Sequence, residues 1–150
     1  MKRVHLAAGV LLCAVHLGIG ATEVAYLTQP SRMVSARASA AADTRAYRMD
    51  AARHIYASYS SRIYKGRLPP LIHGVVVVET TVDASGHPRD VKLVRGPSHA
   101  PDVSVAVMEM IRRAGPLPAP TRLGGARFTE IWLVHKDGRF QLDALTEGQD

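Results

Sequence analysis

Hydrophobic and polar positions divide the chain into blocks, and the clearest block is the valine run of residues 74–83. Nearly continuous valine predicts a β-strand that is buried on both faces, or on one face with the other left for a partner. The segment Asp83-Ala84-Ser85-Gly86 fits a type I turn with glycine in the left-handed position. Residues 87–95 are again β-prone, so the sequence predicts an antiparallel hairpin with Pro88 at the start of its second strand.

Two segments carry the apolar spacing of an amphipathic helix. Residues 43–65 place Tyr47, Ala51, Ile55, Tyr59 and Ile63 four positions apart. This predicts a helix with Asp43 as its N-cap and Gly66 after its end, and it places the tyrosines in the core rather than in a binding site. Residues 101–114 predict a second helix, which begins at a proline and ends before Gly115.

Apolar and polar residues alternate near the C-terminus. Residues 127–135 predict a third strand, and an Asp-Gly turn follows, so residues 139–142 could fold back as a short fourth strand. The predicted fold class is α+β, with two helices packed on one small antiparallel sheet of three to four strands. We expect this domain to span residues 43–145 and the tail of residues 146–150 to fray.

Two helices on one face of so small a sheet would leave its other face uncovered. We expect Val75, Val77 and Trp132 on that face, together with Phe128 or Val134. An exposed apolar patch there would mark a partner or dimer site. Alternatively, the N-terminal tether or the C-terminal tail covers it, and both interpretations stay open.

The N-terminus has the pattern of a bacterial export segment. Met1-Lys2-Arg3 is basic, the following residues up to Ala21 are almost wholly apolar, and small residues cluster at their end. Residues 1–21 are therefore expected to be a signal peptide or an N-terminal membrane anchor, with the rest of the chain exported. Residues 22–42 are polar and alanine-rich and are expected to form a tether.

Charge and candidate chemistry narrow the function classes. The formal net charge is +6, but Lys and Arg are scattered without a basic block, so no nucleic-acid partner is expected. The only cysteine, Cys13, lies in the export segment. The histidines of the expected domain form no pair at metal-ligand spacing, and Ser85 lacks the context of a nucleophile. We therefore expect no enzyme activity, no cofactor and no metal.

The order of these elements resembles the C-terminal domain of the TonB family of energy transducers. The resemblance covers residues 52–142 and rests on short motifs: Gly74-Val75-Val76-Val77, Asp83-Ala84-Ser85-Gly86, Val91, Val94, Asp102, Ala106, Arg112-Arg113-Ala114 and Pro116-Leu117-Pro118-Ala119-Pro120. It implies a periplasmic domain that binds an outer-membrane or periplasmic protein by strand addition, in which an extended peptide pairs with a sheet edge.

Carried over by position, the partner-binding edge comprises Arg127, Phe128, Thr129, Glu130, Ile131, Trp132 and Leu133. Some features differ from the family: the Ser-x-x-x-His signature of the membrane helix and the Pro-rich spacer are absent, and a fourth strand would fill part of this edge. The resemblance implies a role in energy transduction to outer-membrane transport, with inner-membrane anchoring, and the differences indicate a divergent member of such a family. A stand-alone periplasmic interaction module or a homodimer is the alternative.

Overall fold

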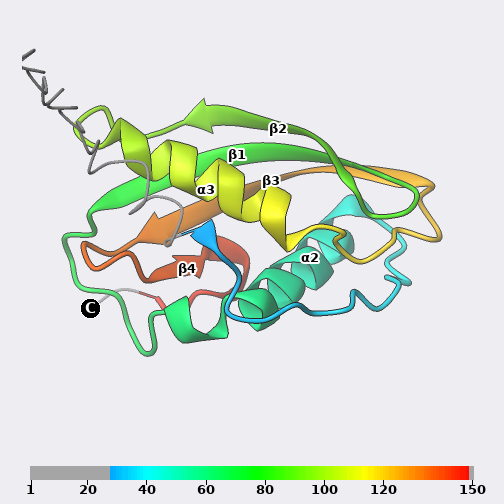
Figure 1. The fold of residues 1–150 in the computed structure, drawn as a ribbon, viewed down its shortest axis with the longest axis horizontal. Coiled ribbons are helices and arrows are strands. Elements are labelled where there is room, and N and C mark those ends of the chain that lie inside the picture. The colour runs from blue at the N-terminus through cyan, green and yellow to red at the C-terminus, as the bar shows by residue number, and fades with distance from the viewer. Residues whose placement is uncertain (1–27, 149–150) are drawn as a thin grey trace, which may run out of the picture.

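The computed structural model describes residues 28–148, and its centre is a four-stranded antiparallel sheet (Figure 1). The strands are β1 (Gly74–Asp83), β2 (Pro88–Arg95), β3 (Gly125–Val134) and β4 (Phe140–Leu142), in the order β2-β1-β3-β4. The predicted α+β class, with two helices on one antiparallel sheet, is confirmed. The hairpin of β1 and β2 begins and ends within one residue of its predicted bounds.

The two predicted helices are α2 (Thr44–Ser58) and α3 (Pro101–Ala114). Asp43 caps α2 as expected, since its carboxylate accepts from the Ala46 N–H at 2.8 Å. The predicted end of α2 at Lys65 was wrong. The helix stops at Ser58, a short 3-10 turn, η1 (Ser60–Arg62), follows, and Ile63 then pairs with Phe140 of β4. Pairing with the sheet thus overrides the helical spacing beyond Ser58.

Both helices pack on the same face of the sheet and form the core with it. Tyr47, Tyr59, Trp132 and Phe140 are all buried there, and the Trp132 and Phe140 rings lie 4.6 Å apart between centroids. The buried tyrosine hydroxyls donate to main-chain carbonyls, that of Tyr47 to Pro118 at 2.8 Å. The prediction that the tyrosine stripe belongs to the core is confirmed.

The other face of the sheet is open, but its residues differ from those expected. Trp132, Phe128 and Val134 are buried on the helix side, so their predicted place on the open face was wrong. Their alternate neighbours Ile131 and Leu133 lie on the open face instead, opposite Val77 and Val75. The register with β1 decides this, because Val76 and Val78 face the helices and their partners on β3 must do the same.

The described parts of the tether and the tail lie against the domain, whereas residues 22–27 and 149–150 lie outside the described residues. In residues 28–42, the Ser31 N–H donates to Ser58 at the end of α2, and Ser39 forms a bridge with Pro120. In the tail, Gly148 accepts from the Leu68 N–H at 3.0 Å, so residues 146–148 are held rather than frayed.

The described residues of the two segments, 28–42 and 146–148, leave the apolar part of the open face uncovered, and Val75 there is 38 % exposed. The expected export segment, residues 1–21, lies outside the described residues. Within residues 28–148, no helix has the length and apolar character needed to cross a membrane.

Candidate functional site

The candidate site is the part of β3 that has a strand on one side only. β3 pairs with β1 along its whole length, whereas β4 pairs only with Trp132, Leu133 and Val134. In the part of the chain that the structure describes, residues 125–131 therefore have no strand neighbour on the side away from β1. This part of the strand, which we call the free β3 edge, could pair with an extended peptide.

The hydrogen bonds around β3 show which of its main-chain groups point outward. The His135 N–H donates toward β4, to Arg139, and the Ile131 N–H donates away from β1, to the Glu130 carboxylate. Because strand groups alternate sides with a period of two, the N–H and C=O of Thr129 and Arg127 point to the same side. Both residues are exposed, and the described hydrogen bonds include none to these four groups on that side.

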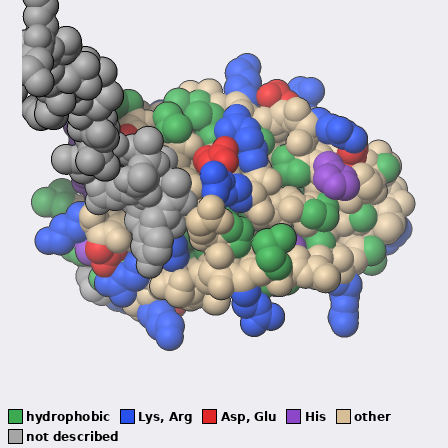
Figure 2. Space-filling model, in the orientation of Figure 1, with side chains coloured by type: hydrophobic (Ala, Val, Ile, Leu, Met, Phe, Trp, Pro, Cys, Tyr) green, Lys and Arg blue, Asp and Glu red, His purple; other side chains and the backbone are tan. Residues whose placement is uncertain are grey.

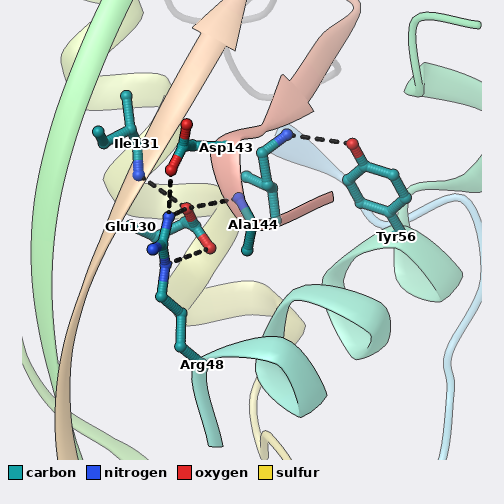
Figure 3. Close-up of polar contacts among 7 residues, drawn as sticks. Arg48, Tyr56, Glu130, Ile131, Asp143 and Ala144 are labelled. Atoms are coloured by element: carbon teal, nitrogen blue, oxygen red, sulfur yellow. Dashed lines mark hydrogen bonds and ion pairs between the residues drawn. The ribbon is translucent and has the colours of Figure 1, made fainter. Parts of the chain in front are cut away.

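A buried carboxylate closes the free β3 edge at its C-terminal end (Figure 3). The Arg48 guanidinium of α2 forms two hydrogen bonds to Glu130, of 2.6 and 3.2 Å, and also contacts Asp143 at 2.8 Å. Glu130 additionally accepts from the N–H groups of Ile131 and Ala144, the latter in the 3-10 turn η2 (Asp143–Leu145). One side chain thereby occupies an edge donor of β3 and joins α2, β3 and η2.

The carboxylate at the centre of this cluster is buried, so its partners must stay in place. The Glu130 side chain is only 3 % exposed, and the carboxylate is compensated by one cation and two main-chain donors. The hydrogen bond to Glu130 raises the pKa of the Arg48 guanidinium above its usual range, against the opposing effect of burial. Because the Glu130 carboxylate occupies the Ile131 N–H, the cluster limits the free β3 edge to the stretch before Glu130.

The seven predicted binding residues do not act alike. Phe128, Glu130 and Trp132 point to the helix side and are buried, so their side chains cannot contact a partner. Arg127, Thr129, Ile131 and Leu133 share the open face, and of these Leu133 lies in the part paired with β4.

Sequence reasoning missed the roles of Arg48 and Asp143. The available signal was Glu130 itself, an acidic residue at a core position of an otherwise apolar alternation, which requires a buried partner.

The other two edges of the sheet offer less. On β4, the Phe140 C=O accepts from the Tyr64 N–H at 2.9 Å, and the Leu142 N–H donates to the Tyr56 hydroxyl at 3.1 Å. On β2, the ladder is irregular at both ends, Pro88 lacks an N–H, and the Arg112 guanidinium contacts the Val91 C=O at 3.4 Å. Proline, bulges and covering charges are common ways in which proteins protect an edge strand.

One group of side chains resembles a catalytic arrangement but lacks its geometry. In the β1–β2 turn, the Ser85 hydroxyl lies 2.8 Å from His87 Nδ1 and 2.6 Å from Asp83 Oδ1. The carboxylate thus contacts the hydroxyl directly, while His87 Nδ1 is 4.0 Å away from it, so it does not orient the imidazole as in a hydrolase triad. The same carboxylate accepts from the N–H groups of Ser85 and His87, so these residues stabilise the turn.

Ligand and metal sites were also sought in residues 28–148. A hollow of about 350 Å³ lies between the tether and α2. Its two buried polar side chains, Ser39 and His54, already have partners, because the Ser39 hydroxyl donates to Asp50 and His54 Nε2 contacts the Ala114 C=O. No group of three or more His, Cys, Asp or Glu side chains in the described residues is placed to hold a metal ion.

Surface charge is dispersed. In Figure 2, Lys and Arg side chains lie around the visible face without forming a continuous basic patch.

Comparison of the chain with models of protein families, with curated proteins and with solved structures gave no match.

Proposed function

We propose that this chain is an exported protein-binding domain that takes up an extended segment of a partner along the free β3 edge. The observation that carries the proposal is the pair of exposed residues Arg127 and Thr129, whose outward N–H and C=O groups have no partner among the described residues. An added strand would form main-chain hydrogen bonds with these four groups, as in other cases of strand addition.

Energetics indicate what else the partner must contact. Four main-chain hydrogen bonds of about 1 kcal/mol each give about 4 kcal/mol, which corresponds to a dissociation constant of about 1 mM. Specific binding thus requires side-chain contacts as well. Thr129 and Ile131 lie next to the edge on the open face and are available for them.

The resemblance to the TonB family supports a periplasmic location and a partner in the outer membrane or periplasm, with a role in energy transduction. One observation favours the alternative of a stand-alone periplasmic module. The tether is bonded to the domain at Ser31 and Ser39, which shortens the chain available to span the periplasm. Fractionation of cells and the intact mass of the natural protein separate these roles: retention of residues 1–21 in the membrane supports a transducer, and cleavage with release supports the module.

Strand addition itself can be tested with a displayed library of random peptides as the probe, selected on the full chain. Thr129→Pro removes an outward N–H and places a ring in the path of an added strand, while the main-chain groups that point toward β1, those of Phe128 and Glu130, are kept. We expect the selected peptides to bind this variant at least about tenfold more weakly, as loss of one hydrogen bond and a steric clash require.

Thr129→Ala is the matched control, since it removes the side chain and keeps the N–H. It should retain most of the peptide affinity, and circular dichroism should show that both variants fold. Equal peptide binding by Thr129→Pro and the parent chain would refute pairing at this edge.

A further inference from the structure

We propose that two copies of this chain associate through the open face of the sheet, the face away from α2 and α3. This inference does not need the main-chain groups of the free β3 edge, although the side chains of Thr129 and Ile131 contribute to both proposals. It rests on how the register of β2, β1 and β3 arranges apolar and charged residues across that face.

One half of the open face is apolar. Val75 lies opposite Leu133, and Val77 lies opposite Ile131, so four aliphatic side chains form a contiguous patch on adjacent strands. All four are partly or well exposed, although aliphatic residues of this size are usually buried. Within residues 28–148, neither the tether nor the tail covers this patch.

The other half carries both signs of charge. One row across the sheet comprises Asp90, Thr81 and Arg127, and the next comprises Lys92, Glu79 and Thr129. These two rows hold two acids and two bases, and Arg95, which lies opposite Val77 at the edge of the apolar half, adds one further base. Acids and bases alternate on this face instead of forming the all-basic surface that an anionic membrane or a nucleic acid favours, and both signs are available for a copy of itself.

A two-fold axis that runs parallel to the strands, between β1 and β3, makes the face self-complementary. Each β1 residue then lies over its own β3 pairing partner in the other copy: Val75 over Leu133, Val77 over Ile131, and Glu79 over Thr129 beside Arg127. Apolar rows meet apolar rows, and each Glu79 lies close to the Arg127 of the other copy. This is the isologous arrangement that a two-fold dimer requires, and it stacks the two sheets as in a β-sandwich.

The size of the face predicts a weak dimer. With this axis β1 and β3 lie over the other copy, and two strands about 4.8 Å apart and about 30 Å long have a projected area of about 290 Å². A stable interface buries about 800 Å² on each partner. We therefore expect reversible association that depends on protein concentration.

Sedimentation velocity over a concentration series, with the full chain in mild detergent, measures this association. The mass should rise from 16.2 kDa toward twice that value. Val75→Glu places a charge in the apolar centre of both copies, so the dimer dissociation constant should rise by at least about tenfold. Val105→Glu is the matched control, because Val105 is also an exposed valine, 55 % accessible, but lies on α3, and it should leave the dissociation constant unchanged.

A charge exchange keeps the test decisive if Val75→Glu fails to fold. Arg127→Glu should weaken the dimer, and the double variant Glu79→Lys with Arg127→Glu should restore it. A parent chain that stays monomeric up to its solubility limit would overturn the proposal, as would a dimer weakened equally by Val75→Glu and Val105→Glu.

Discussion

Replacement of Arg48 by methionine should be among the most damaging single changes outside the apolar core. Methionine keeps much of the volume of the side chain but removes the cation that compensates Glu130. Loss of one partner of a buried ion pair costs about 3–5 kcal/mol, because it leaves an uncompensated buried charge. Arg48 is 28 % exposed and Glu130 keeps two main-chain donors, so we expect the lower end, about 3 kcal/mol.

Urea unfolding followed by tryptophan fluorescence measures this loss directly. Trp132 is the only tryptophan of the chain and is fully buried, so its emission reports loss of the core. Arg53→Met is the matched control: Arg53 lies on the same helix and pairs with Asp50, but its side chain is 63 % exposed. Such a surface pair is expected to contribute less than about 1 kcal/mol.

The reasoning also predicts a partial rescue. Glu130→Gln in the Arg48→Met background removes the uncompensated charge and keeps an acceptor for the main-chain donors. The double variant should therefore be more stable than Arg48→Met alone. The reasoning is refuted if Arg48→Met lowers the free energy of unfolding no more than Arg53→Met does. It is also refuted if the double variant is less stable than Arg48→Met alone.

Two further predictions concern the β1–β2 turn. Gly86 has φ +86°, and a Cβ at this position would lie 2.0 Å from the carbonyl oxygen of Leu117. Gly86→Ala should therefore lower the free energy of unfolding clearly more than Gly124→Ala, because φ is also positive at Gly124 but no atom lies near its Cβ position. Urea unfolding of both variants measures the difference. The Ser85 hydroxyl, with other donors of the turn, holds the pKa of Asp83 well below its usual range, so Asp83 contributes stability that is present above about pH 4 and lost as the pH falls below that value. Asp83→Asn should make the free energy of unfolding less dependent on pH in this range, and an unchanged dependence would contradict the assignment.

Local patterns were enough to predict much of the secondary structure. The bounds of β1 and α3 agree with the prediction, because a valine run with a following turn, and a proline-started apolar stripe, act within the segments themselves. The cap at Asp43 is also local, since it spans three residues. The end of α2 could not be predicted in the same way, because Ile63 pairs with Phe140, which is far away in the sequence.

The candidate site depended on tertiary structure to a greater extent. Alternation along β3 predicts two faces, but only the register with β1 decides that Trp132 faces the helices and Ile131 the open face. The length of β4 decides how much of the free β3 edge remains, and the ion pair that closes this edge joins residues 82 positions apart in the chain. Thus the sequence by itself determined the elements and the fold class, because these follow from local propensity and periodicity. Strand order, register and the buried Arg48–Glu130 pair were decided by tertiary structure, because they arise from contacts between segments that no local pattern encodes.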